Sequence, residues 1–425
     1  MKIAAVLLLA TAALGAQFNP GTDRVLPQAK ELYFDIHSHP ELSWHETRTA
    51  EALASKLRAV GFEVTEQVGK TGVVGVLKNG NGPVVLLRTE LDALPVEEKT
   101  RLPYASKVHT KNDAGQDVGV MHACGHDVHI ASLYGTATRM ANEKDKWHGT
   151  LIVIGQPAEE VGGGAEAMIK DGLFTRFPRP QYAIAFHDGV DEPAGDLSVT
   201  DGYVLANADT VRVTMYGKGT HGSAPQDGID PVLMVARATV ALQSIVSREI
   251  APGEPAVVTV GFINAGTKEN IIPDHAEMGL TVRSYSDLTR QHLLASIQRI
   301  VKAEAQAAGA EKEPKFEIRV GAPSVYNDPK LAARLRSTLQ QTFGADHVRV
   351  GKPAMAGDDF AEMGRSGIPA VMVRFGVANP QEFADAKRTG KQIPSNHSPL
   401  FAPDADPSLR TAITAETAVL QNLLQ

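Results

Sequence analysis

The chain has 425 residues, more than one typical domain holds, and 43% of them are hydrophobic, so we expect two or more domains with sizeable cores. The formal net charge is −7, and no cluster of lysine and arginine residues marks a groove, which argues against a nucleic-acid partner. The aromatic fraction of 5% also leaves few side chains on which bases could stack.

The N-terminal residues have the layout of a secretory signal peptide. Lys2 precedes an apolar stretch at residues 3–14, and the small residues Gly15 and Ala16 lead into polar sequence. A membrane anchor is the alternative, but the run is short for a span, and no later stretch approaches the roughly 18 apolar residues of a spanning helix. We therefore expect a signal peptide at residues 1–16 and an exported protein, periplasmic or secreted, without membrane contact after cleavage.

Residues 25–206 alternate helical patterns with short apolar runs. A helical pattern over residues 25–60 carries His37 and His39, and residues 61–77 are typical of a hairpin. Continuous apolar strands that alternate with helices indicate a mostly parallel α/β sheet. We expect these strands at residues 83–87, 151–154 and 182–186, with a helix at 128–141.

The middle of the chain, residues 207–324, has a different pattern. Half-exposed strands and two helices follow one another in the order β-α-β-β-α-β, which is typical of a ferredoxin-like inserted domain. One face or one edge of its sheet would remain free for a partner. The expected elements lie at residues 211–216, 230–250, 256–262, 278–285, 288–308 and 315–320.

The α/β pattern returns in residues 325–425. A helix is expected at 329–343, a strand at 370–375 and a helix at the C-terminus. The sequence thus predicts an α/β catalytic domain in two parts, residues 25–206 and 325–425, around the inserted domain.

Ionisable residues follow each of the three apolar strands. Glu90 and Asp92 come after the first strand, Glu159 and Glu160 after the second, and His187 after the third. In open α/β sheets ligands gather beyond the carboxyl ends of the strands, so we expect these side chains to converge.

The segment before the helix at 128–141 adds Cys124 and His126 to this set. Thiolate, imidazole and carboxylate groups are what zinc accepts, and manganese binds the last two. Gly125 would let the backbone turn tightly between the two side chains. Of the adjacent Glu159 and Glu160, one can bind metal while the other takes a proton from water, so the pattern suits hydrolysis with two metal ions.

Each of these residues also has a structural interpretation. A single cysteine is more often a small buried residue, a histidine at a strand end is often hydrogen-bonded in the core, and a pair of glutamates usually lies on the surface. Cys124 is the only cysteine, so no intramolecular disulfide can protect it in an oxidising compartment. Together, and in this order at strand ends, the residues favour a site.

From about residue 29 onward the chain resembles peptidase family M20, and within it the amidohydrolases of subfamily D. These include hippurate hydrolases, N-acyl-amino-acid hydrolases and auxin-conjugate hydrolases. The ordered motifs that carry the resemblance are DIHSHPEL at 35–42, ELDALP at 90–95, MHACGHD at 121–127, QPAEE at 156–160, GKGTHGSAP at 217–225, NIIPD at 270–274, GDDF at 357–360 and HSPLF at 397–401.

The resemblance implies a role for each position. Two divalent ions, Zn or Mn with Ni or Co as further candidates, would be held by Cys124, His126, Glu160, His187 and His397. Glu159 would be the general base, and Asp92 would orient a ligand histidine such as His126. In the inserted domain, His221 would polarise the scissile carbonyl, and Asn270 and Arg283 would hold the substrate carboxylate. For His37, His39 and His129 we favour structural or ligand-orienting roles.

The expected reaction is hydrolysis of the amide bond in N-acyl amino acids or related conjugates with a free carboxylate. A dipeptidase or carboxypeptidase of the same fold is the close alternative, and a homodimer through the inserted lid domain is expected. The resemblance is imperfect at Glu90, where relatives commonly have aspartate, at Gln226, and around Asp188, where they have small and apolar residues. These differences leave the ligands intact.

Two other function classes are disfavoured. A non-catalytic binding protein would keep the pocket but lose ligands or the base, whereas all five ligand positions and Glu159 are present. A zinc deaminase needs a later Pro-Cys-x-x-Cys motif, which a chain with one cysteine does not contain.

Overall fold

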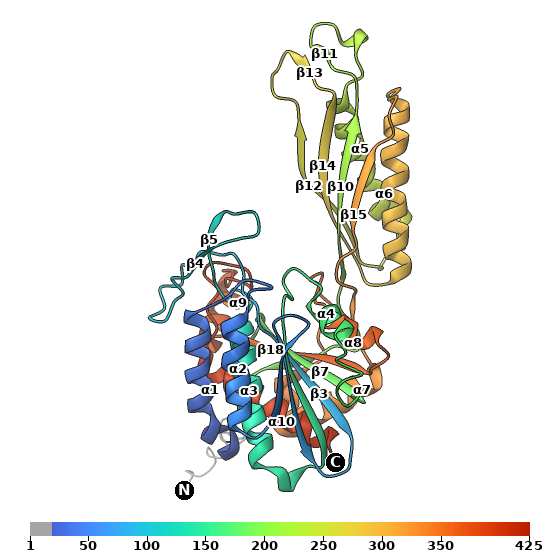
Figure 1. Cartoon of the computed structure of the whole chain (residues 1–425). Coiled ribbons are helices and arrows are strands. Elements are labelled where there is room, and N and C mark those ends of the chain that lie inside the picture. The colour runs from blue at the N-terminus through green and yellow to red at the C-terminus, as the bar shows by residue number, and fades with distance from the viewer. Residues whose placement is uncertain (1–18) are drawn as a thin grey trace, which may run out of the picture. The chain divides into compact units, whose positions relative to one another are not determined.

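The computed structural model describes residues 19–425, so the predicted signal peptide lies outside the described residues (Figure 1). The chain forms two compact units. The large unit takes in the chain up to Val204, Tyr326–Lys352 and Asp359–Gln425, and the inserted unit takes in Leu205–Val325 and Pro353–Asp358. Residues 353–358 were expected in the large unit. They join the inserted unit because Ala354 bridges to Leu205 and Ala206 N–H donates to the carbonyl of Ala356.

The large unit is built on one eight-stranded sheet. β3 pairs in parallel with β6 and β7, and β7 pairs in parallel with β18, while the β1–β2 edge and the β18–β8 pair are antiparallel. The predicted mostly parallel sheet is therefore confirmed. In spatial order the strands are β1 (Glu63–Val68), β2 (Gly72–Asn79), β6 (Gly149–Gln156), β3 (Val84–Glu90), β7 (Tyr182–Pro193), β18 (Ala370–Ala378), β8 (Leu197–Val199) and β17 (Val348–Arg349).

Helices bury the large sheet. Val85, Leu87 and Val153 pack into one core cluster with the long helices, whereas the alternate residues Leu86 and Ile152 are buried outside that cluster, so both faces of the sheet are covered. The helices of this unit are α1 (Pro20–Ser38), α2 (Thr47–Ala59), α3 (His126–Asn142), α4 (Gly164–Lys170), α7 (Pro329–Phe343), α8 (Ala361–Arg365), α9 (Pro380–Thr389) and α10 (Ala405–Leu423).

The helical pattern predicted over residues 25–60 is interrupted. α1 ends at Ser38 and α2 begins at Thr47, because Pro40 lacks an N–H group and disfavours helical geometry in the residue before it. The connecting segment contains Trp44 in a left-handed conformation, with φ of 69°. This break brings Ser43 and Glu46 close to the strand ends. Within residues 19–425 every helix is too short or too polar to cross a membrane.

The inserted unit has the predicted β-α-β-β-α-β order. Its antiparallel sheet has the order β12-β14-β10-β15, and α5 and α6 share one core cluster with it (Figure 1). The elements are β10 (Asn207–Tyr216), α5 (Pro231–Ser244), β12 (Ala256–Ala265), β14 (His275–Ser284), α6 (Asp287–Ala307) and β15 (Lys315–Arg319). The remaining short strands are β4 (His109–Lys111), β5 (Asp117–Gly119), β9 (Gly202–Leu205), β11 (Thr220–His221), β13 (Ile271–Ile272) and β16 (Val325–Asn327).

Candidate metal centre

Polar side chains gather where the central strands end. β3 ends at Glu90 and β6 at Gln156. β7 was expected to end at residue 186 but continues to Pro193; its pairing with β3 nevertheless stops at Ala185, so His187 lies beyond the end of that pairing.

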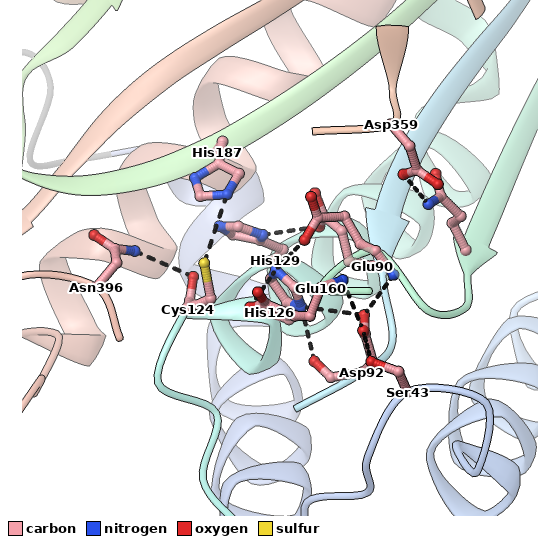
Figure 2. Close-up of polar contacts among 12 residues, drawn as sticks. Ser43, Glu90, Asp92, Cys124, His126, His129, Glu160, His187, Asp359 and Asn396 are labelled. Atoms are coloured by element: carbon pink, nitrogen blue, oxygen red, sulfur yellow. Dashed lines mark hydrogen bonds and ion pairs between the residues drawn. The ribbon is translucent and has the colours of Figure 1, made fainter. Parts of the chain in front are cut away.

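The Cys124–His126 segment forms the start of α3. Gly125 is the N-cap residue and has φ of 79°, a backbone conformation that residues with a side chain rarely adopt. A Cβ atom there would also lie 2.3 Å from Oδ2 of Asp188. Glycine is therefore required on both grounds, as the sequence predicted. The turn brings the side chains of Cys124 and His126 to the same centre (Figure 2).

Two buried carboxylates hold the turn after β6. Ala158 has φ of 49°, and its N–H donates to Oε1 of Glu46 at 2.8 Å. The next two N–H groups, of Glu159 and Glu160, donate to Oδ1 and Oδ2 of Asp92 at 3.1 and 3.0 Å. The backbone carrying the predicted base and ligand is therefore fixed by Glu46 and Asp92. Glu46 was missed, since nothing in the sequence near residue 46 points to residue 158.

Asp92 also orients His126, as predicted. Nδ1 of His126 lies 2.7 Å from the backbone oxygen of Asp92 and 3.6 Å from Oδ1. Since the Nδ1–H donates there, Nε2 is directed at the centre. Ser43 Oγ donates to Oδ2 of Asp92 at 2.6 Å and completes the support.

The five predicted ligands form two groups that share Cys124. The ligand atoms of Cys124, His126 and His187, here the His187 triad, lie within 4.8 Å of one another, as do those of Cys124, Glu160 and His397, the His397 triad. Ligand atoms around one tetrahedral ion lie about 3–4 Å apart. Cys124 Sγ is 4.0 Å from His187 Nε2, and His397 Nε2 is 3.4 Å from Glu160 Oε2. Two ions bridged by Cys124 fit this arrangement.

The electrostatics of the centre also favour divalent cations. Among the described residues, Nε2 of His126 has no hydrogen-bond partner although the ring is fully buried. Burial raises the pKa of the Cys124 thiol well above its usual range, and the carboxylates of Glu160, Glu159 and Asp188 raise it further. Burial by itself would lower the pKa of His126, but Asp92 and Glu160 raise it to about 9. Metal binding must displace these protons, and the ions then offset the buried negative charge.

Glu159 lies beside the ligands. It is 9% exposed, and its Oε2 is 3.9 Å from Nε2 of His126. His397 completes the second triad with φ of 70°, while its N–H donates to the carbonyl of Ala123 at 2.7 Å. A non-glycine residue in this region is strained and is held by its surroundings, which is common at functional sites.

The other histidines of the motifs have protein partners. His37 lies between Asp127 and Glu98, with nitrogen–oxygen distances of 2.6 and 3.2 Å. His39 Nδ1 is 2.8 Å from the carbonyl of Asp35 on the surface. These contacts fit the structural roles that the sequence favoured.

The inserted unit contains the three remaining predicted residues. His221 and Asn270 line one cavity of about 850 Å³, and Gly222 N–H donates to the Asn270 carbonyl. Nδ1 of His221 accepts the N–H of Ser223 at 3.1 Å, so Nε2 carries the proton of the neutral ring. Arg283 lies near the other end of β14, paired with Ala208 and Val257.

Asn270 and Arg283 are too far apart in one inserted unit to bind the same group. The eight residue steps from His275 to Arg283 span about 27 Å, and Asn270 precedes His275. Arg283 also donates to Thr281 Oγ1 and the Val282 carbonyl at 2.6 and 3.0 Å. Asn270 and Arg283 of one inserted unit therefore do not contact the same carboxylate.

The sequence of this chain matches a known family of hydrolases. Residues 86–390 match peptidase family M20/M25/M40. The chain belongs to peptidase family M20. It is a hydrolase of the amidohydrolase and metallopeptidase type that uses two divalent metal ions.

Individual relatives cover most of the chain. Hippurate hydrolase of Campylobacter jejuni is 39% identical over 78% of this chain and 83% of that protein. Thermostable carboxypeptidase 1 of Saccharolobus solfataricus is 36% identical over 87% of this chain and 89% of that protein. The structure of a Bacillus subtilis protein, described as a dinuclear metal-binding peptidase of the M20 family, covers 93% of this chain and 98% of its own, with 29% identity and a TM-score of 0.74.

Proposed function

We propose that this M20 hydrolase cleaves the amide bond of N-acyl amino acids, or of related conjugates with a free carboxylate. The observation that carries the proposal is the pair of triads sharing Cys124, with the Glu159 carboxylate beside them. The similarity to hippurate hydrolase supports an N-acyl amino acid as substrate. The similarity to a carboxypeptidase supports a peptide substrate as the second candidate.

Different residues of the centre have different roles in hydrolysis. When bound, the two ions would acidify water and polarise the scissile carbonyl. The Glu159 carboxylate takes the proton of the attacking water and delivers it to the leaving nitrogen. Asp92 keeps Glu159 and Glu160 in place through their backbone N–H groups, and its carbonyl accepts Nδ1–H of His126, which directs Nε2 at the centre.

The roles of the inserted unit stay predictions that rest on the resemblance. His221 fits the polarising role, because its protonated Nε2 is a hydrogen-bond donor. Since Asn270 precedes β14 and Arg283 lies near the far end of that strand, a substrate held by both residue types would need the inserted units of two subunits.

Zinc and manganese are the ions we propose, with nickel and cobalt as further candidates. The thiolate of Cys124 would favour zinc over manganese, whereas His187, His397 and Glu160 would suit either ion.

Two variants test the function. Glu159→Gln is expected to lower kcat by about 10²–10⁴-fold while two ions stay bound, because only the proton acceptor is removed. Cys124→Ala is expected to lower the metal-to-protein ratio, because both triads lose a ligand. The measurements are hydrolysis of N-acyl amino acids and dipeptides, and metal analysis after dialysis. Retained turnover in the first variant, or two tightly held ions in the second, would contradict the assigned roles.

We also propose a homodimer formed through the inserted unit. β12 is an edge strand that pairs only with β14 among the described strands, and Phe262 and Ile263 on it are 41% and 43% exposed. The adjoining α5 exposes Leu233 and Val240 by 57% and 74%. An apolar edge of this kind is suited to pairing with a second copy. Sedimentation analysis is expected to show a dimer that Ile263→Lys dissociates; a monomeric parent protein would exclude it.

Export is proposed on the N-terminal residues alone. Lys2, the apolar run and the small residues at 15 and 16 predict cleavage and a periplasmic or secreted protein. N-terminal sequencing of the protein from its native host tests this, and an intact Met1 would contradict it.

A further inference from the structure

His129 is a buried histidine whose two ring nitrogens both have partners, and neither partner is a ligand side chain. Nδ1 lies 2.9 Å from Oε2 of Glu90, and Nε2 accepts the backbone N–H of Asp188 at 3.0 Å. All three residues are at most 2% exposed. Figure 2 shows His129 between Glu90 and His187.

These contacts fix where the proton of the ring lies. Because Nε2 accepts an N–H, it carries no proton, so the proton of the neutral ring is on Nδ1 and donates to Glu90. His129 therefore has no lone pair to offer a metal ion, although its ring centre is only 4.8 Å from that of His187.

The bond to Asp188 acts on the neighbouring ligand. Asp188 directly follows His187 in β7, and Nδ1 of His187 lies 2.9 Å from the Asp188 carbonyl. The His129 ring thus holds the peptide N–H of Asp188, the residue whose carbonyl contacts the His187 imidazole. Arg88, which is also buried and forms an ion pair with Glu90, holds the carboxylate that orients His129.

A further hydrogen bond of Asp188 connects this arrangement to the segment before His397. Oδ1 of Asp188 accepts Nδ2–H of Asn396 at 3.0 Å, and Asn396 also donates to the Cys124 carbonyl at 3.3 Å. Asp188 therefore connects α3, the Cys124 segment and the residue before His397. His129 acts more directly on His187 than on His397.

We propose that His129, oriented by Glu90, is a positioning residue that sets the metal affinity of the His187 triad through the Asp188 N–H group. The inference rests on the proposed function, because it assumes that the His187 triad holds an ion. Mutation of a residue that orients a metal ligand without binding the metal itself typically changes the metal affinity about 10–100-fold.

A matched pair of variants separates the two bonds of the ring. In His129→Gln the amide oxygen reaches the place of Nε2 and keeps an acceptor for the Asp188 N–H. In His129→Asn the shorter amide reaches the place of Nδ1 and keeps only the donor for Glu90. We expect His129→Gln to bind both ions nearly as the parent does, and His129→Asn to bind one of them about 10–100-fold more weakly.

The measurement is metal titration of the full-length protein against a chelating competitor, with zinc as the probe. Thr136→Ala is the control, because Thr136 is buried on the same helix and bonds Glu416. The control should lower the melting temperature without changing either metal affinity. Equal losses in the Gln and Asn variants, or none in the Asn variant, would overturn the proposal.

A second measurement does not depend on how the Asn variant folds. In protein labelled with ¹⁵N-histidine, the resonances that disappear in His129→Gln should belong to a ring protonated on Nδ1 and bare on Nε2. A ring protonated on Nε2 would overturn the proposal. Failure of the proposed function is distinguishable, because a parent protein that binds fewer than two ions would reveal it without any His129 variant.

Discussion

Glu416 shows how a single buried carboxyl links stability to pH. It lies on α10, and its two oxygens accept the hydroxyls of Ser132 and Thr136 on α3 at 2.7 and 2.6 Å. Burial raises the pKa of Glu416 from 4.5 to about 7, and the two hydroxyl bonds offset this only in part. The folded protein therefore keeps this carboxyl protonated under conditions in which the unfolded chain ionises it.

The sign of the effect follows from linkage. A folded pKa above the unfolded value stabilises the fold below pH 4.5, and that contribution is lost as the pH rises through 7. We expect Glu416→Gln to match the parent near pH 4.5 and to exceed its free energy of unfolding by about 2–3 kcal/mol above pH 8. Denaturant unfolding at the two pH values checks this; an equal change at both would show that packing, not ionisation, is responsible.

At the scale of elements, the turn between β6 and α4 is held by acceptors from distant segments. Glu46 accepts the N–H groups of Trp44 and Ala158, both in left-handed conformations, and the Thr71 hydroxyl at 2.6 Å. A buried N–H without an acceptor costs about 1–3 kcal/mol, and the left-handed conformation of Ala158 adds strain. The position of Glu159, the proposed base, therefore depends on Glu46.

Glu46→Ala is expected to lower kcat by about 10–100-fold, because a displacement near 1 Å in a catalytic group has effects of that size. Glu46→Gln keeps an acceptor for both N–H groups and should retain most of the activity. Thr71→Val is the matched control, since it removes only the bond to the other carboxylate oxygen. Comparable losses of kcat in the Gln and Ala variants would argue against positioning through these bonds.

The whole molecule consists of two units with separate cores. The five predicted metal ligands all belong to the large unit, whereas the inserted unit has its own core cluster around Val213, Met278 and Leu293. A ligand that binds only the native state stabilises by about 4 kcal/mol at a thousand times its dissociation constant. Metal should therefore stabilise one unit only.

Removal of metal by a chelator is expected to lower the melting temperature of the large unit and to leave that of the inserted unit unchanged. Differential scanning calorimetry of the full-length protein with and without chelator measures both transitions. A shift of both transitions, or of neither, would contradict ligand binding confined to the large unit.

The sequence by itself determined most of the elements and their order, and it predicted a ligand set. Apolar runs and helical periodicity are local properties, so α7 and the β-α-β-β-α-β order were predicted from short windows. The spacing of Cys124, Gly125 and His126 was informative because a tight turn needs only neighbouring residues. The break between α1 and α2 was local as well, and Pro40 could have revealed it.

Only the tertiary structure decided which groups orient the ligands and which residues act together. Glu46 and Ala158 are 112 residues apart, and Asp188 and Asn396 are 208 apart, so no periodicity connects them. The tautomer of His129 depends on Glu90 and Asp188 at once, and Arg283 lies near one end of β14 whereas Asn270 precedes its other end. Hydrogen bonds act over about 3 Å, and only the folded chain brings such distant residues within that range.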